Sequence, residues 1–289
     1  MHLLFPLLSS LLYVAGILFI KRCSDFQVGI WRTTFIANTL TAVLFSFLLF
    51  LDGSLPPGQQ LWKPFITALL FIAGQILSFV AVEKGDVSVA TPVMGIKILL
   101  VAFFSVLLLA ESVSLRLWVA AFLATAGIVF LHLGPSQTSH PIGRTVLISV
   151  LAALAFAIFD VLVQKWSPQF GPGGFLPVMM WIVAALSIGF IPLFKKPLNT
   201  ISRAAWTPLF WGSLFIGLQA IVLITTLAVY GDATAVNVVY SLRGLWSLAA
   251  VWFIGHWFKN REKQQGAAVF RFRLIGALLL STAVILVLL

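Results

Sequence analysis

Two cations stand inside long apolar stretches of this sequence, where a charge needs a chemical reason. Lys97 lies in GDVSVATPVMGIKILLVAFFSVLLLAE (85–111), and Arg243 lies in GDATAVNVVYSLRGLWSLAAVWFIG (231–255). In both stretches a Gly-Asp pair is followed by ten residues and then by the cation. At about 1.5 Å of rise per residue, a helix places either charge about 16 Å beyond the pair, near the middle of a bilayer core about 30 Å thick.

A charge at that depth costs about 2.5–3.5 kcal/mol on insertion scales, so neither side chain is expected to face lipid. One interpretation makes Lys97 and Arg243 a clamp for an anion, because guanidinium offers a planar fork to carboxylate or phosphate and ammonium offers a mobile point charge. The other makes one of them the structural partner of Asp160, the intramembrane acid in LAFAIFDVLVQKW (154–166), or of a helix C-terminus. Asp160 is also the candidate for carrying a coupling proton.

Polar and aromatic neighbours of the two cations are candidate substrate contacts. Met94 lies three residues before Lys97 and Tyr240 three before Arg243, a spacing that puts each pair on the same helix face. The remaining candidates are amide side chains in neighbouring apolar runs. These candidate contacts are Met94, Tyr240, Gln75, Asn237 and Gln219. The alternative stays open that the amides join helices and that the tyrosine only packs, because polar side chains also hold membrane helices together.

The composition is that of a polytopic membrane protein. Of 289 residues, 61% are hydrophobic and 9% charged, and the mean hydropathy is +1.09, whereas soluble domains are about half apolar and a quarter charged. The net charge of +10 does not indicate nucleic-acid binding, because most Lys and Arg residues lie between apolar runs. The single Cys23 excludes an intrachain disulfide. We expect no cofactor, no bound metal and no nucleic-acid partner.

Ten apolar runs are long enough to cross a bilayer as helices, which need about 20 residues and satisfy their own backbone polar groups. The predicted spans are 3–20, 27–51, 64–82, 88–110, 114–133, 143–164, 173–194, 206–229, 233–256 and 269–288. The sequence therefore predicts an all-α membrane protein with ten transmembrane helices.

The two halves of the sequence repeat one another. A shift of 146 residues brings Lys97 onto Arg243, and a shift of 144 brings Lys21 onto Lys165. Each half holds five predicted helices, and an odd number of crossings inserts the second half upside down relative to the first. The predicted domains are a five-helix repeat at 1–134, a connector at 135–142 and an inverted five-helix repeat at 143–289. Inverted repeats are typical of secondary transporters.

Residues 69–131 carry a recognisable pattern, LLFIAGQILSFVAVEKGDVSVATPVMGIKILLVAFFSVLLLAESVSLRLWVAAFLATAGIVFL. Pro92 lies near a helix start, Glu111 ends the segment LLLAE, and Gly127 lies in the following helix. This pattern resembles the drug/metabolite transporter superfamily, in its EamA-like ten-helix branch. The second half departs from it, because Trp257 stands where the first half has Glu111.

The resemblance implies two five-helix repeats around a central cavity that is lined mainly by helices three, four, eight and nine. It implies transport of small metabolites without choosing among amino acids, nucleosides, sugar phosphates or nucleotide sugars. The sugar-phosphate branch binds phosphate through basic residues on the fourth and ninth helices, as Lys97 and Arg243 would. That branch has a paired Lys-Arg on the ninth helix, whereas Leu242 precedes Arg243 here, so phosphate is not favoured over carboxylate.

These observations predict a secondary active transporter that moves a small organic, anionic metabolite by alternating access. The runner-up is an exporter of amino acids or neutral metabolites in the same family. An intramembrane enzyme is a distant alternative, because His2, His132, His140 and His256 fall at or near run ends and none is spaced to pair with an acid. The expected partners are a small-molecule substrate and the lipid bilayer, and a monomer or a homodimer is equally open.

The predicted location is the cell (inner) membrane, with both termini on one side because ten is even. Apart from the two intramembrane cations, three basic residues lie on that side, Lys63, Arg116 and Lys165, and thirteen lie opposite. The positive-inside rule therefore favours termini outside, whereas the family usually has them inside. Both orientations stay open.

Overall fold

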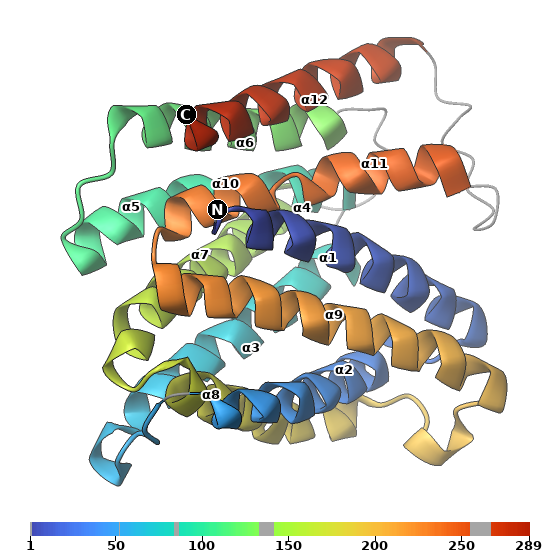
Figure 1. The fold of residues 1–289 in the computed structure, drawn as a ribbon. Coiled ribbons are helices and arrows are strands. Elements are labelled where there is room, and N and C mark those ends of the chain that lie inside the picture. Colours follow the sequence, from blue (N-terminus) through green and yellow to red (C-terminus); the bar gives the residue numbers. More distant parts are fainter. Residues whose placement is uncertain (1, 52, 84–86, 133–141, 255–266) are drawn as a thin grey trace. The chain divides into compact units, whose positions relative to one another are not determined.

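The computed structural model describes residues 2–51, 53–83, 87–132, 142–254 and 267–289. Every regular element in these ranges is a helix (Figure 1). Nine helical spans in the described part of the chain are long and apolar enough to cross a membrane. The prediction of an all-α membrane protein is confirmed, and the count of ten crossings stays a prediction.

The elements of the two halves follow one another in the same order, with α for α-helices and η for 3₁₀ helices. The first half contains α1 Leu4–Cys23, η1 Ser24–Phe26, α2 Ile30–Phe45, η2 Ser46–Phe50, η3 Gly58–Gln60, α3 Trp62–Glu83, α4 Val87–Met94, α5 Lys97–Leu109 and α6 Leu115–His132. The second contains α7 Ile142–Trp166, η4 Ser167–Gln169, α8 Pro172–Ser187, η5 Ile188–Leu193, η6 Leu198–Thr200, α9 Arg203–Tyr230, α10 Ala233–Tyr240, α11 Arg243–Ile254 and α12 Ala267–Leu288.

The correspondence extends to local backbone geometry. Helices α2 and α8 both have 16 residues and both run directly into a 3₁₀ helix. Each is preceded by a glycine in a positive-φ conformation, Gly29 at 82° and Gly171 at 73°, which residues with a side chain rarely adopt. The second helix of each half therefore begins in the same way, directly after a positive-φ glycine. The repeat boundaries themselves stay a prediction, and of the predicted connector only residue 142 is described.

The chain forms two compact units, and each takes helices from both halves. Unit 1 comprises residues 73–161 and 232–289, and unit 2 comprises residues 2–72 and 162–231. Unit 1 contains α4–α6 and α10–α12, and unit 2 contains α1, α2, α8 and α9. Helices α3 and α7 are each divided between the units.

In unit 1, α6 packs along α12, its counterpart in the second half (green and red in Figure 1). A Cβ on Gly276 would lie 2.7 Å from the carbonyl oxygen of Gly127 and 2.7 Å from the amide nitrogen of Leu131. The Phe130 ring lies 6.3 Å from the Phe272 ring, centre to centre. Residue numbers thus increase along α6 in the direction in which they decrease along α12, so the two helices are antiparallel. The glycines let the two backbones approach closely.

In unit 2, α2 packs in the same way against its counterpart α8. Asn38 Nδ2 donates to Ser187 Oγ at 2.8 Å, and Trp181 Nε1 donates to Ser46 Oγ at 2.8 Å, so this pair is antiparallel as well. A two-fold axis between inverted repeats would bring corresponding helices together in this antiparallel manner. The packing inside each unit therefore supports the inversion inferred from the odd helix count.

Candidate functional site

The two intramembrane cations each begin a helix immediately after a break. Helix α4 has eight residues and ends at Met94, and α5 begins at Lys97; α10 has eight residues and ends at Tyr240, and α11 begins at Arg243. The predicted span 88–110 is confirmed as a membrane-length segment, Val89–Leu109, with a turn inside it, and the predicted span 233–256 has a corresponding turn between α10 and α11. The shift of 146 residues that aligned the cations also aligns both pairs of helices.

The breaks arise because the backbone tightens from α-helical to 3₁₀ hydrogen bonding. The amide nitrogens of Gly95 and Ile96 donate to carbonyls three residues earlier, at 3.0 and 3.1 Å. Pro92 lacks an N–H group, so α4 is already short of one helical hydrogen bond. In the second half Leu242 makes the same three-residue bond to Val239 at 3.1 Å without a proline. Discontinuous helices of this kind mark substrate and ion sites in transporters.

Each cation is thereby placed at the amino-terminal end of a helix segment, α5 or α11. Helical hydrogen bonding resumes directly after each break, since Leu100 N donates to the Ile96 carbonyl and Trp246 N donates to the Leu242 carbonyl, both at 3.0 Å. Burying a cation in apolar surroundings is unfavourable without a nearby anion. Lys97 and Arg243 therefore favour negative charge at both breaks.

Within unit 1, Lys97 forms an ion pair with Asp160 of α7. Lys97 Nζ lies 2.7 Å from Asp160 Oδ2, and Asn237 Nδ2 of α10 donates to the same oxygen at 2.8 Å and to the Ala233 carbonyl at 2.9 Å. Asp160 is 2% exposed, and Lys97 Nζ also lies 5.8 Å from the centre of the Phe156 ring. The interpretation in which one cation pairs with Asp160 therefore holds for Lys97.

The geometry of this pair leaves room for a further ligand contact. Lys97 and Asn237 both contact the Asp160 carboxylate at Oδ2. An ammonium carries three donors, of which Lys97 directs one to Asp160, with Phe156 beside it. A ligand with both an acceptor and a donor would complete the pair without breaking it.

Arg243 is held differently, by an aromatic face. Its guanidinium carbon lies 4.5 Å from the centre of the Tyr240 ring, and Tyr240 is buried. The predicted shared helix face of these two residues is confirmed. Stacking on an aromatic face orients the plane of a guanidinium, the group whose fork of donors suits a carboxylate or phosphate.

The other predicted contacts are divided between the two units. Met94 accepts a hydrogen bond at its sulfur from Ser78 Oγ at 3.5 Å, and Gln75 lies half-buried on α3 in unit 1. Gln219 lies in unit 2, where its Oε1 accepts from Ser9 Oγ at 3.1 Å and joins α9 to α1. The helix-joining interpretation therefore describes Gln219, and Asn237 serves Asp160. Substrate contact by any of these residues stays a prediction.

The role of Phe156 was missed at the level of sequence. It lies four residues before Asp160 on α7 and therefore on the same helix face, which is a signal that spacing alone offered. It also contacts α3, because a Cβ on Gly74 would lie 2.9 Å from its ring. The first Gly-Asp pair, at 85–86, lies outside the described residues. In the second pair, Asp232 Oδ1 accepts from the Ala235 amide at 3.2 Å and caps α10.

Comparison with known proteins finds a family match in the first half of the chain. Residues 1–133 match the EamA-like transporter family. The resemblance drawn from residues 69–131 is thereby confirmed, and the matched segment is nearly the whole of the predicted first repeat. With its nine membrane-length helices in the described residues, the chain is a multi-pass membrane protein.

Two further similarities extend beyond that segment. Protein PecM of Dickeya dadantii (strain 3937) is 28% identical over 166 residues, which make up 53% of this chain and 55% of PecM, so the match spans about half the length of each. A crystal structure of a protein superposes with a TM-score of 0.75 at 15% identity and covers 99% of this chain and 96% of its own. That similarity establishes a shared fold.

Proposed function

We propose that this protein is a secondary transporter that carries a small organic metabolite by alternating access, with a carboxylate or phosphate group bound at Lys97 and Arg243. The observation that carries the proposal is the matched pair of broken helices, each with a cation as the first residue after its break. The similarity of residues 1–133 to the EamA-like transporter family supports the same proposal.

The ion pair suggests how binding is coupled to an energy source. An anion that approaches Lys97 competes with Asp160 for the same ammonium. A proton on Asp160 would remove that competition, so one proton would accompany one anionic charge and the net charge of the site would not change. In an exchanger, a second anion would take the place of the proton. Asp160 is therefore the candidate proton carrier.

The carboxylate of Asp160 beside Lys97 favours a second candidate, a zwitterionic amino acid. Its carboxylate would bind Arg243 or Lys97 and its ammonium would donate to the Asp160 carboxylate, so the substrate would enter without any change in net charge or protonation. The two candidates differ in a measurable way, because the anion requires a proton or a counter-anion and the zwitterion does not.

The proposal is tested by uptake into proteoliposomes of phosphorylated, carboxylated, zwitterionic and neutral metabolites, chosen by a thermal-shift screen. Arg243→Gln removes one anion contact, and the double variant Lys97→Gln/Asp160→Asn removes the other without leaving a buried charge. A charged hydrogen bond contributes about 1.5–3 kcal/mol, so each variant should slow anion uptake roughly 10- to 100-fold. Lys195→Gln, an exposed charge in the loop after η5, is the matched control.

Anion uptake at the wild-type rate in both variants would refute the clamp. Uptake of only zwitterions, with no pH dependence, would replace the anion by the amino-acid candidate.

A further inference from the structure

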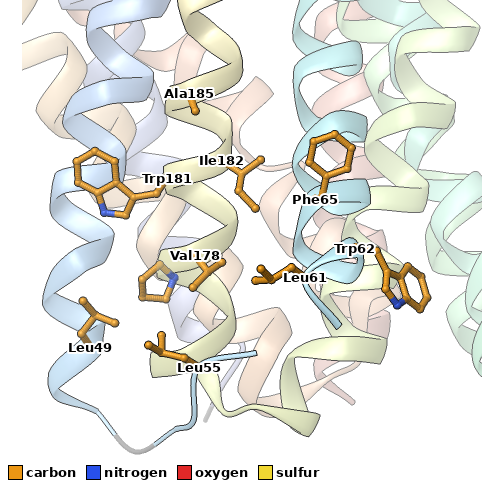
Figure 2. A pocket seen from close by; sticks show the side chains of 10 residues that line it. Leu49, Leu55, Leu61, Trp62, Phe65, Val178, Trp181, Ile182 and Ala185 are labelled. Atoms are coloured by element: carbon orange, nitrogen blue, oxygen red, sulfur yellow. The ribbon is translucent and has the colours of Figure 1, made fainter. Parts of the chain in front are cut away.

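Unit 2 contains an apolar groove that none of the candidate site residues lines. Its volume is about 730 Å³, and every side chain that lines it is aliphatic or aromatic. Figure 2 shows Leu61 and Phe65, at the start of α3, across the groove from Val178 and Ile182 of α8. Most of the side chains on its α3 wall are exposed, so the groove is open to the surroundings of the protein.

The position of the groove along its helices matches that of a lipid acyl chain. Its α3 wall lies where a membrane-spanning segment begins, at 58–82, and Leu49 lies where another ends, at 30–50. From this level the groove follows α8 from Pro177 to Ala185, about 12 Å at the helical rise per residue. One end therefore lies at the bilayer surface and the other in the hydrocarbon, which excludes a water-borne solute as its natural occupant.

A cation without an acidic partner lies at the surface end. Lys63 follows Trp62, a lining residue, and its Nζ lies 5.9 Å from the centre of the Trp62 ring and 5.3 Å from that of Phe170. Lys63 Nζ donates to the neutral amide oxygens of Gln60 and Gln169. No carboxylate in the described part of the chain pairs with it, so two of its three donors are used and its charge is not neutralised.

We propose that this groove binds an anionic phospholipid, with one acyl chain along α8 and the phosphate at Lys63. The apolar lining selects the chain, and the charge of Lys63 selects an anionic headgroup over a zwitterionic one. Basic positions at this level attract acidic lipids, with a preference of about fivefold for each Lys near the surface. The tryptophan at the rim suits the headgroup level, where indole rings gather. The proposal is independent of the transported substrate.

Native mass spectrometry of the purified protein tests this with two lipids of equal chain length, dioleoyl phosphatidylglycerol and dioleoyl phosphatidylcholine. The wild type should retain the phosphatidylglycerol about fivefold better. Lys63→Gln should abolish that preference, whereas Lys195→Gln, at the opposite end of α8, should keep it. Ala185→Trp, which fills the inner end of the groove, should reduce retention of both lipids.

Three outcomes would overturn the proposal. The first is equal retention of the two lipids by the wild type, which removes the headgroup contact. The second is an unchanged preference in Lys63→Gln. The third is unchanged retention in Ala185→Trp, which shows that the acyl chain lies elsewhere. Thermal unfolding of each variant in detergent confirms that the protein compared is folded.

Discussion

The ion pair between Lys97 and Asp160 gives the sharpest test of how unit 1 is built. At 2.7 Å and an effective dielectric constant of about 20, the attraction between the charges is about 6 kcal/mol. Desolvation of each ion opposes it by several kcal/mol, so the intact pair contributes little net stability. Removing one partner leaves the other charge buried and uncompensated, which costs about 3–5 kcal/mol.

The perturbation is a double-mutant cycle of Lys97→Met, Asp160→Asn and the variant that carries both. Each single variant should lower the free energy of unfolding by about 3–5 kcal/mol, because one charge loses its partner. The double variant buries neither charge, so its loss should be about 3 kcal/mol smaller than the sum of the single losses. The assay is reversible unfolding in mixed micelles, followed by far-ultraviolet circular dichroism.

Strict additivity of the two single losses would refute the reasoning, because it would mean that the side chains do not interact in the folded protein. An Asp160→Asn variant as stable as the wild type would refute it as well. Lys195→Met is the control for the loss of a lysine, and its stability should stay within about 0.5 kcal/mol of the wild type, as for other surface substitutions.

Two further predictions concern packing and coupling. Gly276→Ala places a Cβ 2.7 Å from backbone atoms of α6 and should cost about 1–3 kcal/mol of unfolding free energy; Gly143→Ala on α7 meets open space and should gain about 0.5–1 kcal/mol in the same assay. Asp160→Asn should abolish the pH dependence of uptake in a proton-coupled carrier, whereas anion exchange would continue; retained pH dependence in this variant would exclude Asp160 as the proton carrier.

Some features of the site were within reach of the sequence because they depend on short spacings. Lys97 and Arg243 were recognised as counterparts because each stands at the same distance from a Gly-Asp pair. Tyr240 was placed beside Arg243 because it lies three positions earlier in the sequence, a spacing that shares a helix face. The membrane class followed from composition, since water does not dissolve a chain so rich in exposed apolar groups.

The helix breaks were not foreseen. Pro92 and Gly95 offered a signal in the first half, but α10 breaks without a proline. An i→i+3 turn differs from an α-helical turn by little energy, so the surrounding packing decides where it forms.

The sequence by itself determined that the chain is a duplicated helical membrane protein and that two cations occupy equivalent positions in its halves. Only the tertiary structure decided that Asp160 and Asn237 serve Lys97 whereas Tyr240 supports Arg243. It likewise decided that Gln219 holds α9 to α1 through Ser9, 210 residues away in the chain. Contacts between residues so distant in sequence depend on which helix faces pack together, and local spacing along the chain does not predict this packing.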